Sequence, residues 1–425
     1  MAGLDQDHPA DVHQPGGSAH AHFPAFDGLR ALAATSVAVF HAAFLSGYTA
    51  RAGWAPLLTH GDVGVTIFFL ISGFLLYRPM VAAHVDGRRP MGAGPFLWRR
   101  FLRIYPAYWF TFLAILLTFG FQKGTPSDTR SSVIYLLLLQ IYDFRCVGGG
   151  ITQTWTLGTE VSFYAFLPLY TRVIRGAAAR VRASPVAVEA AGVGALILTS
   201  FLWRTGWVLY VRHAPPTSAF MASGVSVLAQ FAWLPSFLDL FGLGMGLAVA
   251  SAWSARTGES GSGAGAARTV QRAIMMVRDH PAWCWAIAAG CYWVTCFHMG
   301  LLVFPVGFRK MLGQTCYGLV ALFLLLPAVF PSYGSSMVDR VLRARPVAFL
   351  GLVSYGIYLW HQAWIAQAFP WLGILPFRGK LGRVFAVAFP LTVGAAAVNY
   401  YLVERPAMRR RDLVLGRGRV APRSL

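Results

Sequence analysis

Long apolar stretches separated by short polar segments dominate the chain. A helix that crosses a membrane needs about 20 mostly apolar residues, and ten stretches of suitable length recur along the 425 residues. The pattern therefore predicts an all-α integral membrane protein, a polytopic bundle of about ten transmembrane helices. We expect the spans near 29–49, 62–80, 103–122, 159–174, 186–205, 225–252, 283–304, 313–330, 347–369 and 384–404.

One further apolar run, at residues 132–142, is too short to cross a bilayer. If this run returns to the side it came from, most Lys and Arg residues fall on one side of the membrane. An excess of Lys and Arg marks the cytoplasmic loops of membrane proteins. We therefore expect a re-entrant or interfacial helix at 132–142 and place both termini in the cytoplasm.

Composition excludes an ordinary soluble protein. Hydrophobic residues make up 56% of the chain and charged residues only 12%, more apolar surface than one soluble core can bury. The net charge of +20 is a feature of nucleic-acid binders too. Here the excess lies in short clusters between apolar runs, so the expected partner is the lipid bilayer and not a nucleic acid.

The remaining segments predict little chemistry of their own. The polar, His-containing start has neither a signal peptide nor a regular metal-binding spacing, and the five cysteines form no CxxC pair. We expect small buried cysteines, no metal site and an unknown oligomeric state. The predicted organisation is a disordered tail at 1–24, a single transmembrane domain at 25–406 with a flexible linker at about 254–280, and a basic cytoplasmic tail at 407–425.

The first predicted span carries two ionisable side chains on one face. Arg30 and His41 are eleven residues apart, about 20° more than three full helical turns and about 16.5 Å along the axis. Arg30 would then lie at the cytoplasmic edge, with His41 just past the middle of the bilayer. A neutral imidazole there can accept a proton from a hydroxyl; the alternative is a core histidine bonded to a neighbouring helix.

Two other spans bring polar groups to a similar depth. Glu160 begins a span from the outer side, and His361 lies about 21 Å in from the cytoplasmic side of another. A carboxylate beside His41 would hold its tautomer and stabilise the imidazolium. Ser354 and Tyr358 precede His361 on one helix face and would line the same cavity, or form hydrogen bonds between helices.

A cluster of arginines starts the third span. Arg99, Arg100 and Arg103 fit ordinary anchoring at the cytoplasmic face, but guanidinium groups also match phosphate oxygens in two-point contacts. With Arg30 they would hold an anionic nucleotide whose long arm reaches inward to His41. Coenzyme A has that shape, so acyl-CoA is the expected donor.

Three further acidic residues lie within or at the ends of the predicted spans. Asp239 falls near mid-membrane and either lines the cavity or satisfies a helix break beside Pro235. Asp62 and Glu404 lie at the ends of spans, where charge costs little, and receive no chemical role. Trp155, five residues before Glu160, is a candidate for the cavity wall.

The ordered series of motifs resembles the membrane-bound acyltransferase family 3, whose members O-acylate surface polysaccharides, glycolipids, Nod factors and macrolides. The resemblance runs from Phe26 to Pro406, and no single motif carries it. The motifs are FDGLRALAATSVAVFH, GVTIFFLISGFLL, RRFLRIYPAYW, WTLGTEVSFY, LGLVSYGIYLWH and VERP.

The resemblance implies roles for particular residues. Arg30 and His41 match the essential arginine and histidine of the family, Arg100 and Arg103 match its RxxR motif, and Glu160 falls on its glutamate. Thr66 departs from the pattern, because many members carry Asp there, and this puts a role for that carboxylate in doubt. The chain also ends soon after the last predicted span, so we expect no appended esterase-like domain.

Together these features predict an acyl-CoA-dependent O-acyltransferase of a bacterial cytoplasmic membrane. It would transfer an acetyl or other short acyl group from acyl-CoA, as co-substrate and not a bound cofactor, to a hydroxyl of a carbohydrate, glycolipid or similar acceptor. His41 would act as general base, oriented by Glu160, with His361 assisting acceptor binding; an acyl-histidine intermediate is the less favoured variant. The alternatives are a transporter or flippase of a lipid-linked sugar and a noncatalytic scaffold.

Overall fold

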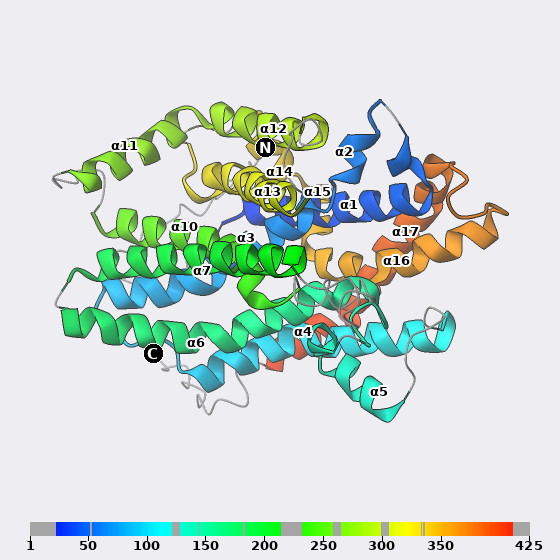
Figure 1. The fold of residues 1–425 in the computed structure, drawn as a ribbon, viewed down its shortest axis with the longest axis horizontal. Coiled ribbons are helices and arrows are strands. Elements are labelled where there is room, and N and C mark those ends of the chain that lie inside the picture. The colour runs from blue at the N-terminus through cyan, green and yellow to red at the C-terminus, as the bar shows by residue number, and fades with distance from the viewer. Residues whose placement is uncertain are drawn as a thin grey trace, which may run out of the picture.

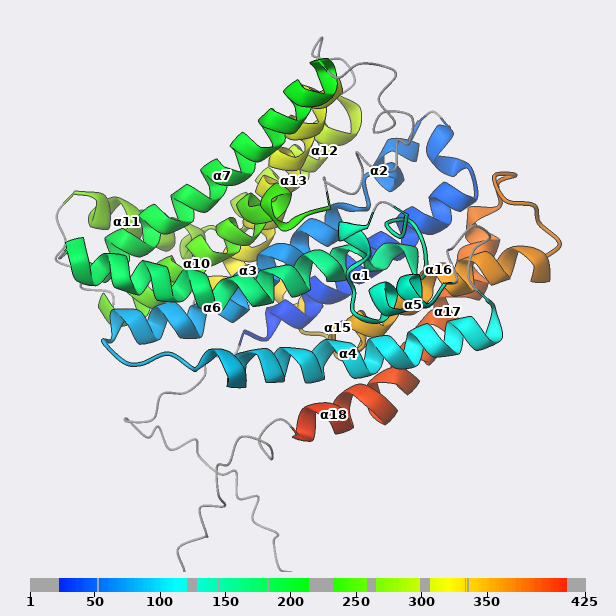
Figure 2. The ribbon, with the colours of Figure 1, turned by 60° about the horizontal axis from the view of Figure 1, so that its bottom comes forward.

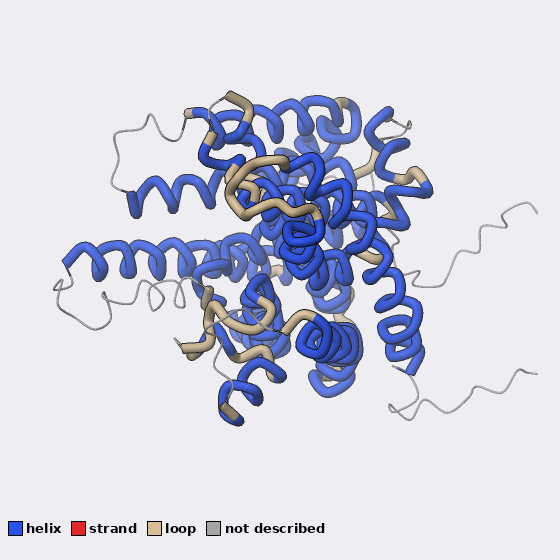
Figure 3. The backbone as a smooth tube through the Cα atoms, turned by 90° about the vertical axis from the view of Figure 1, so that its right-hand side faces the viewer, coloured by secondary structure: helices blue, strands red, loops and turns tan. Residues whose placement is uncertain are grey.

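The computed structural model consists of helices joined by loops (Figure 1). It describes residues 23–51, 53–120, 128–143, 145–181, 183–213, 232–257, 265–298, 306–332, 334 and 336–410. Within these ranges there is no β-strand, as the uniformly helical trace of Figure 3 shows. The predicted all-α class is confirmed.

Many of the long helices run roughly side by side along the longest axis of the molecule (Figures 1 and 2). They form because apolar, helix-forming stretches of this length satisfy every internal backbone hydrogen bond without water. The long helices are α1 (Ala25–Leu45), α3 (Val63–Val85), α4 (Ala93–Thr118), α6 (Trp155–Val181), α7 (Pro185–His213), α10 (Leu238–Thr257), α12 (Pro281–Phe297), α13 (Val306–Val329), α16 (Ser354–Trp371) and α17 (Leu381–Asn399). Of these, α7, α12 and α13 run obliquely to the longest axis (Figures 1 and 2).

Shorter elements connect the long helices. The short α-helices are α2 (Ala55–Thr59), α5 (Thr129–Leu136), α11 (Ala266–Asp279), α14 (Met337–Leu342), α15 (Arg345–Leu352) and α18 (Arg405–Arg409). The 3₁₀ turns are η1 (Tyr48–Ala50), η2 (Gln140–Tyr142), η3 (Thr152–Thr154) and η4 (Leu234–Phe237), and η6 (Tyr400–Glu404) is a π-helical turn.

Seven of the described helices are long and apolar enough to cross a membrane. They cover Ala25–Leu45, Val63–Val85, Ala93–Thr118, Pro185–Tyr210, Leu234–Thr257, Phe308–Val329 and Leu381–Arg409. The chain is thus a multi-pass membrane protein. The other three expected spans correspond to α6, the 17-residue α12 and α16, so the count of ten and the cytoplasmic termini stay predictions.

Several boundaries differ from the prediction. The span expected at 347–369 is broken at Val353 into α15 and α16. The segment 254–280 is not a linker throughout, because α10 continues to Thr257 and α11 fills Ala266–Asp279, whose helix-forming residues repeat apolar positions every three to four residues. Residues 1–22, 225–231, 258–264 and 411–425 of the predicted segments lie outside the described residues.

The run at 132–142 does not continue as one helix. It contains the end of the eight-residue α5 and the turn η2, and α5 is too short to cross a bilayer. Tyr108 and Trp109 of α4 donate hydrogen bonds to the carbonyl oxygens of Tyr135 and Leu136. These bonds hold the end of α5 against α4.

Glycines allow the central helices to approach closely. A Cβ atom at Gly73 of α3 would lie 2.3 Å from the carbonyl oxygen of Phe241, and one at Gly244 of α10 would lie 2.1 Å from that of Leu70. Gly351 of α15 is pressed against α1, where a Cβ would lie 1.9 Å from the carbonyl oxygen of Asp27. Small residues at helix contacts are the usual device for packing in membranes.

The bundle has two ends with different chemistry. The start of α1 and α4 and the end of α3, α6 and α10 lie at one end, here called the arginine end because Arg30, Arg100 and Arg103 belong to it. The end of α1 and α4 and the start of α3, α10, α13 and α17 lie at the other end, the histidine end. Figure 2 shows α18 alongside α4 on one side of the bundle.

Candidate functional site

A cavity of about 130 Å³ lies within the bundle toward the arginine end. We call it the arginine cavity. It brings together six residues expected at the site, namely Arg30, Arg100, Arg103, Glu160, Ser354 and Tyr358. The rest of the wall consists of Val65, Phe68, Phe69, Ile71, Ser72, Leu75, Leu76, Ile104, Thr156, Leu157, Tyr164 and Tyr355.

The three cavity arginines differ in their partners. Arg103 makes an ion pair with Glu404, and Arg30 makes one of 2.9 Å with Asp27. The Arg100 guanidinium lies over the Phe96 ring at 6.0 Å and has no carboxylate partner within the described part of the chain. Arg100 is therefore the cation of this cavity most available to an anionic ligand, while the predicted fourth member, Arg99, does not line the cavity.

The expectation that Glu404 is a surface charge at a span end was wrong. Its side chain is only 1% exposed, and Arg103 comes from a helix about 300 residues earlier. Glu404 sits in the π-helical turn η6 between α17 and α18, which turns the carboxylate toward α4. A buried carboxylate is stable only with such a partner.

Glu160 does not contact His41, contrary to the expected orienting role. Its carboxylate accepts a 2.5 Å hydrogen bond from Ser72 and a 2.6 Å bond from Tyr164, both within the arginine cavity. The expected position in the outer part of the membrane, at the depth of His41, does not hold, because Glu160 lines the cavity toward the arginine end. Glu160 thus shapes the arginine cavity.

The imidazole beside His41 is that of His361, from α16. Nε2 of His361 lies 3.1 Å from Nδ1 of His41, and the ring centroids are 4.9 Å apart. Nδ1 of His41 also lies 3.0 Å from the carbonyl oxygen of Val37, and Nδ1 of His361 lies 3.1 Å from that of Ile357. Two residues 320 positions apart are thus joined, as their similar depths suggested.

These contacts fix the tautomers. A carbonyl oxygen only accepts, so Nδ1 of His361 carries a hydrogen toward Ile357, and its Nε2 is then the acceptor of the neutral ring. Nδ1 of His41 must therefore carry the hydrogen shared by Val37 and His361. The remaining nitrogen, Nε2 of His41, then carries the lone pair of the neutral ring and makes no hydrogen bond to a residue that the structure describes. This is the form that a proton acceptor requires.

His41 opens into a second cavity, the histidine cavity, of about 650 Å³. The ring is half-buried, whereas His361 is 1% exposed and does not line the cavity. The wall combines aromatic and amide side chains. Its members besides His41 are Phe40, Phe44, Leu45, Ile115, Phe119, Gly120, Gly150, Ile151, Thr152, Gln153, Gln362, Ala363, Ala366 and Gln367.

A thin wall separates the two cavities. Tyr358 donates a 2.9 Å bond to the carbonyl oxygen of Gln153 and lies 2.7 Å from the Thr156 hydroxyl. The Gln153 amide donates to the carbonyl oxygens of Tyr358 and Leu359 at 3.1 and 2.8 Å. The expectation that His41 shares one cavity with the arginines, Ser354 and Tyr358 was therefore wrong. On α16, Tyr358 lines the arginine cavity and Gln362 lines the histidine cavity, and these two residues are about one turn, about 6 Å, apart along the helix.

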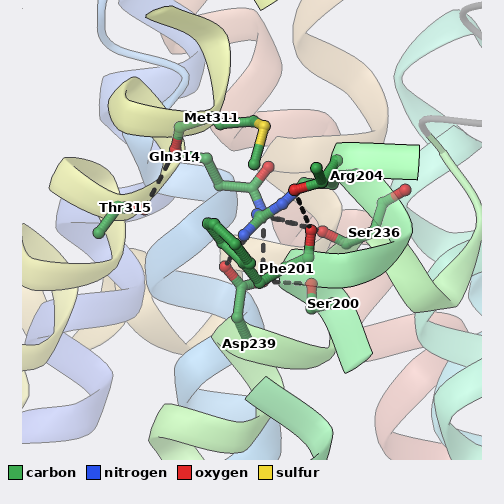
Figure 4. A network of polar contacts seen from close by, with 9 residues as sticks. Ser200, Phe201, Arg204, Ser236, Asp239, Met311, Gln314 and Thr315 are labelled. Carbon is green, nitrogen blue, oxygen red and sulfur yellow. Dashed lines mark hydrogen bonds and ion pairs between the residues drawn. The ribbon is translucent and has the colours of Figure 1, made fainter. Parts of the chain in front are cut away.

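Asp239 lines neither cavity. Figure 4 shows its carboxylate in a buried network, with an ion pair of 2.8 Å to Arg204 and hydrogen bonds of 3.0 Å from Ser200 and 3.1 Å from Gln314. Arg204 was missed in the sequence, although an arginine inside an apolar span signals a buried partner. Asp239 was expected either to line the cavity or to bond polar groups at a helix break beside Pro235, and the structure supports the second alternative.

Trp155 lies beside a third cavity, of about 740 Å³, at the histidine end. Trp155 was expected at the His41 site but lines this other space. Asp62, expected to be an inert end charge, accepts a 2.7 Å hydrogen bond from Tyr317. Thr66 also lines this cavity, where the family pattern would place a carboxylate.

The site belongs to a multi-pass helical membrane protein and combines a histidine pair with an arginine-lined cavity. The model of acyltransferase family 3, described as an acyltransferase domain, matches residues 23–403. The chain belongs to this acyltransferase family.

The relatives are bacterial. The chain is similar to a putative peptidoglycan O-acetyltransferase, YrhL of Bacillus subtilis, at 24% identity over 91% of the chain and 55% of the relative. The peptidoglycan O-acetyltransferase OatA of Listeria monocytogenes is 24% identical over 83% and 51%, and the acyltransferase MdmB of Streptomyces mycarofaciens is 30% identical over 50% and 53%. The chain thus spans about half the length of these curated relatives. No solved structure is significantly similar to it.

Proposed function

We propose that this protein transfers a short acyl group, such as acetyl, from acyl-CoA to a hydroxyl of a cell-envelope glycan, with His41 as general base. The single observation that carries the proposal is that His41, whose Nε2 makes no hydrogen bond to a described residue, lines a cavity large enough for a sugar. Membership of an acyltransferase family and similarity to proteins named peptidoglycan O-acetyltransferases support the reaction class and the glycan acceptor.

The donor would bind at the arginine end. Arg100, which has no carboxylate partner among the described residues, would contact a phosphate of acyl-CoA, with Arg30 and Arg103 adding positive potential. The pantetheine arm is long and slender and would follow the cavity to Tyr358. A change in the Tyr358 side chain would then bring the thioester to the histidine cavity.

The acyl group would pass directly from the thioester to the acceptor hydroxyl. Nε2 of His41 takes the proton of the acceptor hydroxyl while its oxygen attacks the thioester carbonyl carbon. The C–S bond then breaks, and the imidazolium returns the proton to the departing thiolate. His361 stays neutral and holds the His41 ring through the contact at Nδ1. The products are an ester and free coenzyme A.

The acceptor would enter the histidine cavity from the opposite end. Thr152, Gln153, Gln362 and Gln367 offer hydrogen-bonding groups, and Phe40 and Phe119 offer flat apolar faces. This combination is suited to sugar rings, which present hydroxyls at the edge and C–H groups on the face. We infer a bacterial cytoplasmic membrane as the location, in which the donor arrives from the cytoplasm.

The test uses purified full-length protein in lipid nanodiscs with radiolabelled acetyl-CoA and a glycan acceptor. Wild type should form labelled ester, and His41→Ala should lose about 10²- to 10⁴-fold in rate, the usual contribution of a positioned base. His280→Ala, a histidine on the loop between α11 and α12, is the matched control. Equal rates for wild type and His41→Ala would overturn the catalytic role, and glycan movement without ester would favour a flippase.

A further inference from the structure

The third cavity, at the histidine end, has polar groups that the proposed reaction does not use. It lies between α2, the start of α3, the start of α10, the end of α12 and α13. We call it the Tyr317 cavity. It shares no wall residue with the histidine cavity around His41, although Val65 lines both it and the arginine cavity.

Hydrogen bonds define the polarity of one wall. The Tyr317 hydroxyl donates to Oδ1 of Asp62 at 2.7 Å and lies 2.6 Å from Nδ1 of His60. A hydroxyl has a single hydrogen, so toward His60 the Tyr317 oxygen must accept, and Nδ1 of His60 carries the hydrogen. Burial lowers the pKa of His60 and so favours the neutral ring. The nearby Asp62 has a smaller effect in the opposite direction.

Two acceptor atoms remain on this wall. Oδ2 of Asp62 and Nε2 of His60 make no hydrogen bond to another described residue, and both belong to residues that line the cavity. Each can accept a hydrogen from a ligand hydroxyl. The Trp155 ring lines the same space and offers a flat apolar face. Hydroxyl acceptors beside an aromatic ring are the features of a carbohydrate site.

The lining also contains two cationic side chains. Arg309 and Lys310, in the first turn of α13, line the cavity and make no ion pair within the described residues. Two adjacent cations without a carboxylate partner favour a ligand that carries negative charge. Asp62, the acidic member of the lining, is already bonded to Tyr317.

We propose that the Tyr317 cavity binds an anionic carbohydrate, with its hydroxyls toward Asp62 and His60 and its negative group toward Arg309 and Lys310. This choice of ligand rests on the proposed function, because the cavity would hold a second part of the same glycan acceptor. The negative group is a carboxylate or a phosphate, and two probes distinguish them.

Binding is measured without any donor, by saturation-transfer NMR on the full-length protein in nanodiscs. The probes are N-acetylglucosamine, N-acetylmuramic acid and N-acetylglucosamine 1-phosphate, which are neutral, carboxylated and phosphorylated. At least one charged sugar should bind about 10-fold more tightly than the neutral sugar, and Arg309→Gln with Lys310→Gln should abolish that preference.

The matched control removes two charges elsewhere at the same end. Lys380→Gln with Arg383→Gln, on exposed residues at the start of α17, should keep the preference, and so should His41→Ala. Equal affinity for all three sugars, or a preference that survives loss of Arg309 and Lys310 or disappears in His41→Ala, would overturn the proposal. If acyl transfer fails but the charge-dependent binding remains, only the proposed function is wrong.

Discussion

His361 accepts a hydrogen bond at Nε2 from Nδ1 of His41, across 3.1 Å between α16 and α1. His361 is itself fixed by the carbonyl oxygen of Ile357. The state of the proposed base is thus set by a backbone group on a different helix, and not by a carboxylate as in a serine-protease triad.

His361→Phe should lower the transfer rate constant about 10- to 100-fold with little change in either KM, because the His41 ring loses the acceptor that orients it. His361→Gln, whose amide oxygen can accept the same hydrogen, should recover much of the loss. Steady-state kinetics with both substrates varied checks this. If His361→Phe instead raised the acceptor KM alone, the residue would bind acceptor, as the sequence suggested.

Replacing the two arginines of the RxxR motif should have different effects. Arg103→Ala leaves Glu404 buried without a partner and should cost about 3 kcal/mol of stability, the low end for a broken buried pair because Arg103 keeps 31% exposure. Adding Glu404→Gln should restore much of it. Thermal unfolding in detergent provides the measurement.

Arg100→Ala should leave the unfolding temperature near that of wild type, because no carboxylate depends on it in the described structure. It should raise the donor KM about 10-fold through loss of a charged contact with phosphate. Arg88→Ala, an exposed arginine of the same end, is the control. An unchanged donor KM in Arg100→Ala would argue against donor binding at this cavity.

Tyr358→Phe removes the hydroxyl that bonds Gln153 and Thr156 and should loosen the wall between the cavities. The expected result is faster hydrolysis of acyl-CoA without acceptor, because water reaches the thioester, at the same or lower rate of transfer. Release of coenzyme A, followed with a thiol reagent, measures this. Ser354→Ala alters the arginine cavity without touching the wall bonds and should leave hydrolysis unchanged.

Removing one partner of the buried pair of Arg204 and Asp239 should destabilise the protein more than replacing both partners together. Asp239→Ala leaves Arg204, which is 4% exposed, without its counter-ion and should cost about 3 kcal/mol or more of stability. Arg204→Met combined with Asp239→Leu should be much less destabilising, since buried ion pairs can be replaced by apolar side chains of similar size. Unfolding temperatures of the two variants test the difference.

The sequence was most informative where position along a helix decides the outcome. Counting the rise per residue from each expected membrane edge placed His41 and His361 at one depth, and they are in contact. The same count gathered Arg30, Arg100 and Arg103 at one end, where they line one cavity. The depth of a residue in the membrane follows from the number of residues that separate it from the end of its helix, so it can be predicted without knowing how the helices pack.

The spacing of residues along the sequence could not predict how each helix is rotated about its own axis. Glu160 was expected beside His41 in the outer part of the membrane, yet its side chain accepts hydrogen bonds from Ser72 and Tyr164 in the arginine cavity. Glu404 was missed because η6 winds as a π-helical turn, which changes the direction of a side chain near the end of α17. Which face each helix presents depends on its neighbours, and those contacts join residues hundreds of positions apart.

The wall of Tyr358, Gln153 and Thr156 has a consequence beyond catalysis. Its three side chains are joined by hydrogen bonds, and the wall stands between the two cavities. A cell that depends on its proton-motive force cannot tolerate an open aqueous pore. Such a layer would let a small acyl group cross the bilayer while the membrane keeps its electrical insulation.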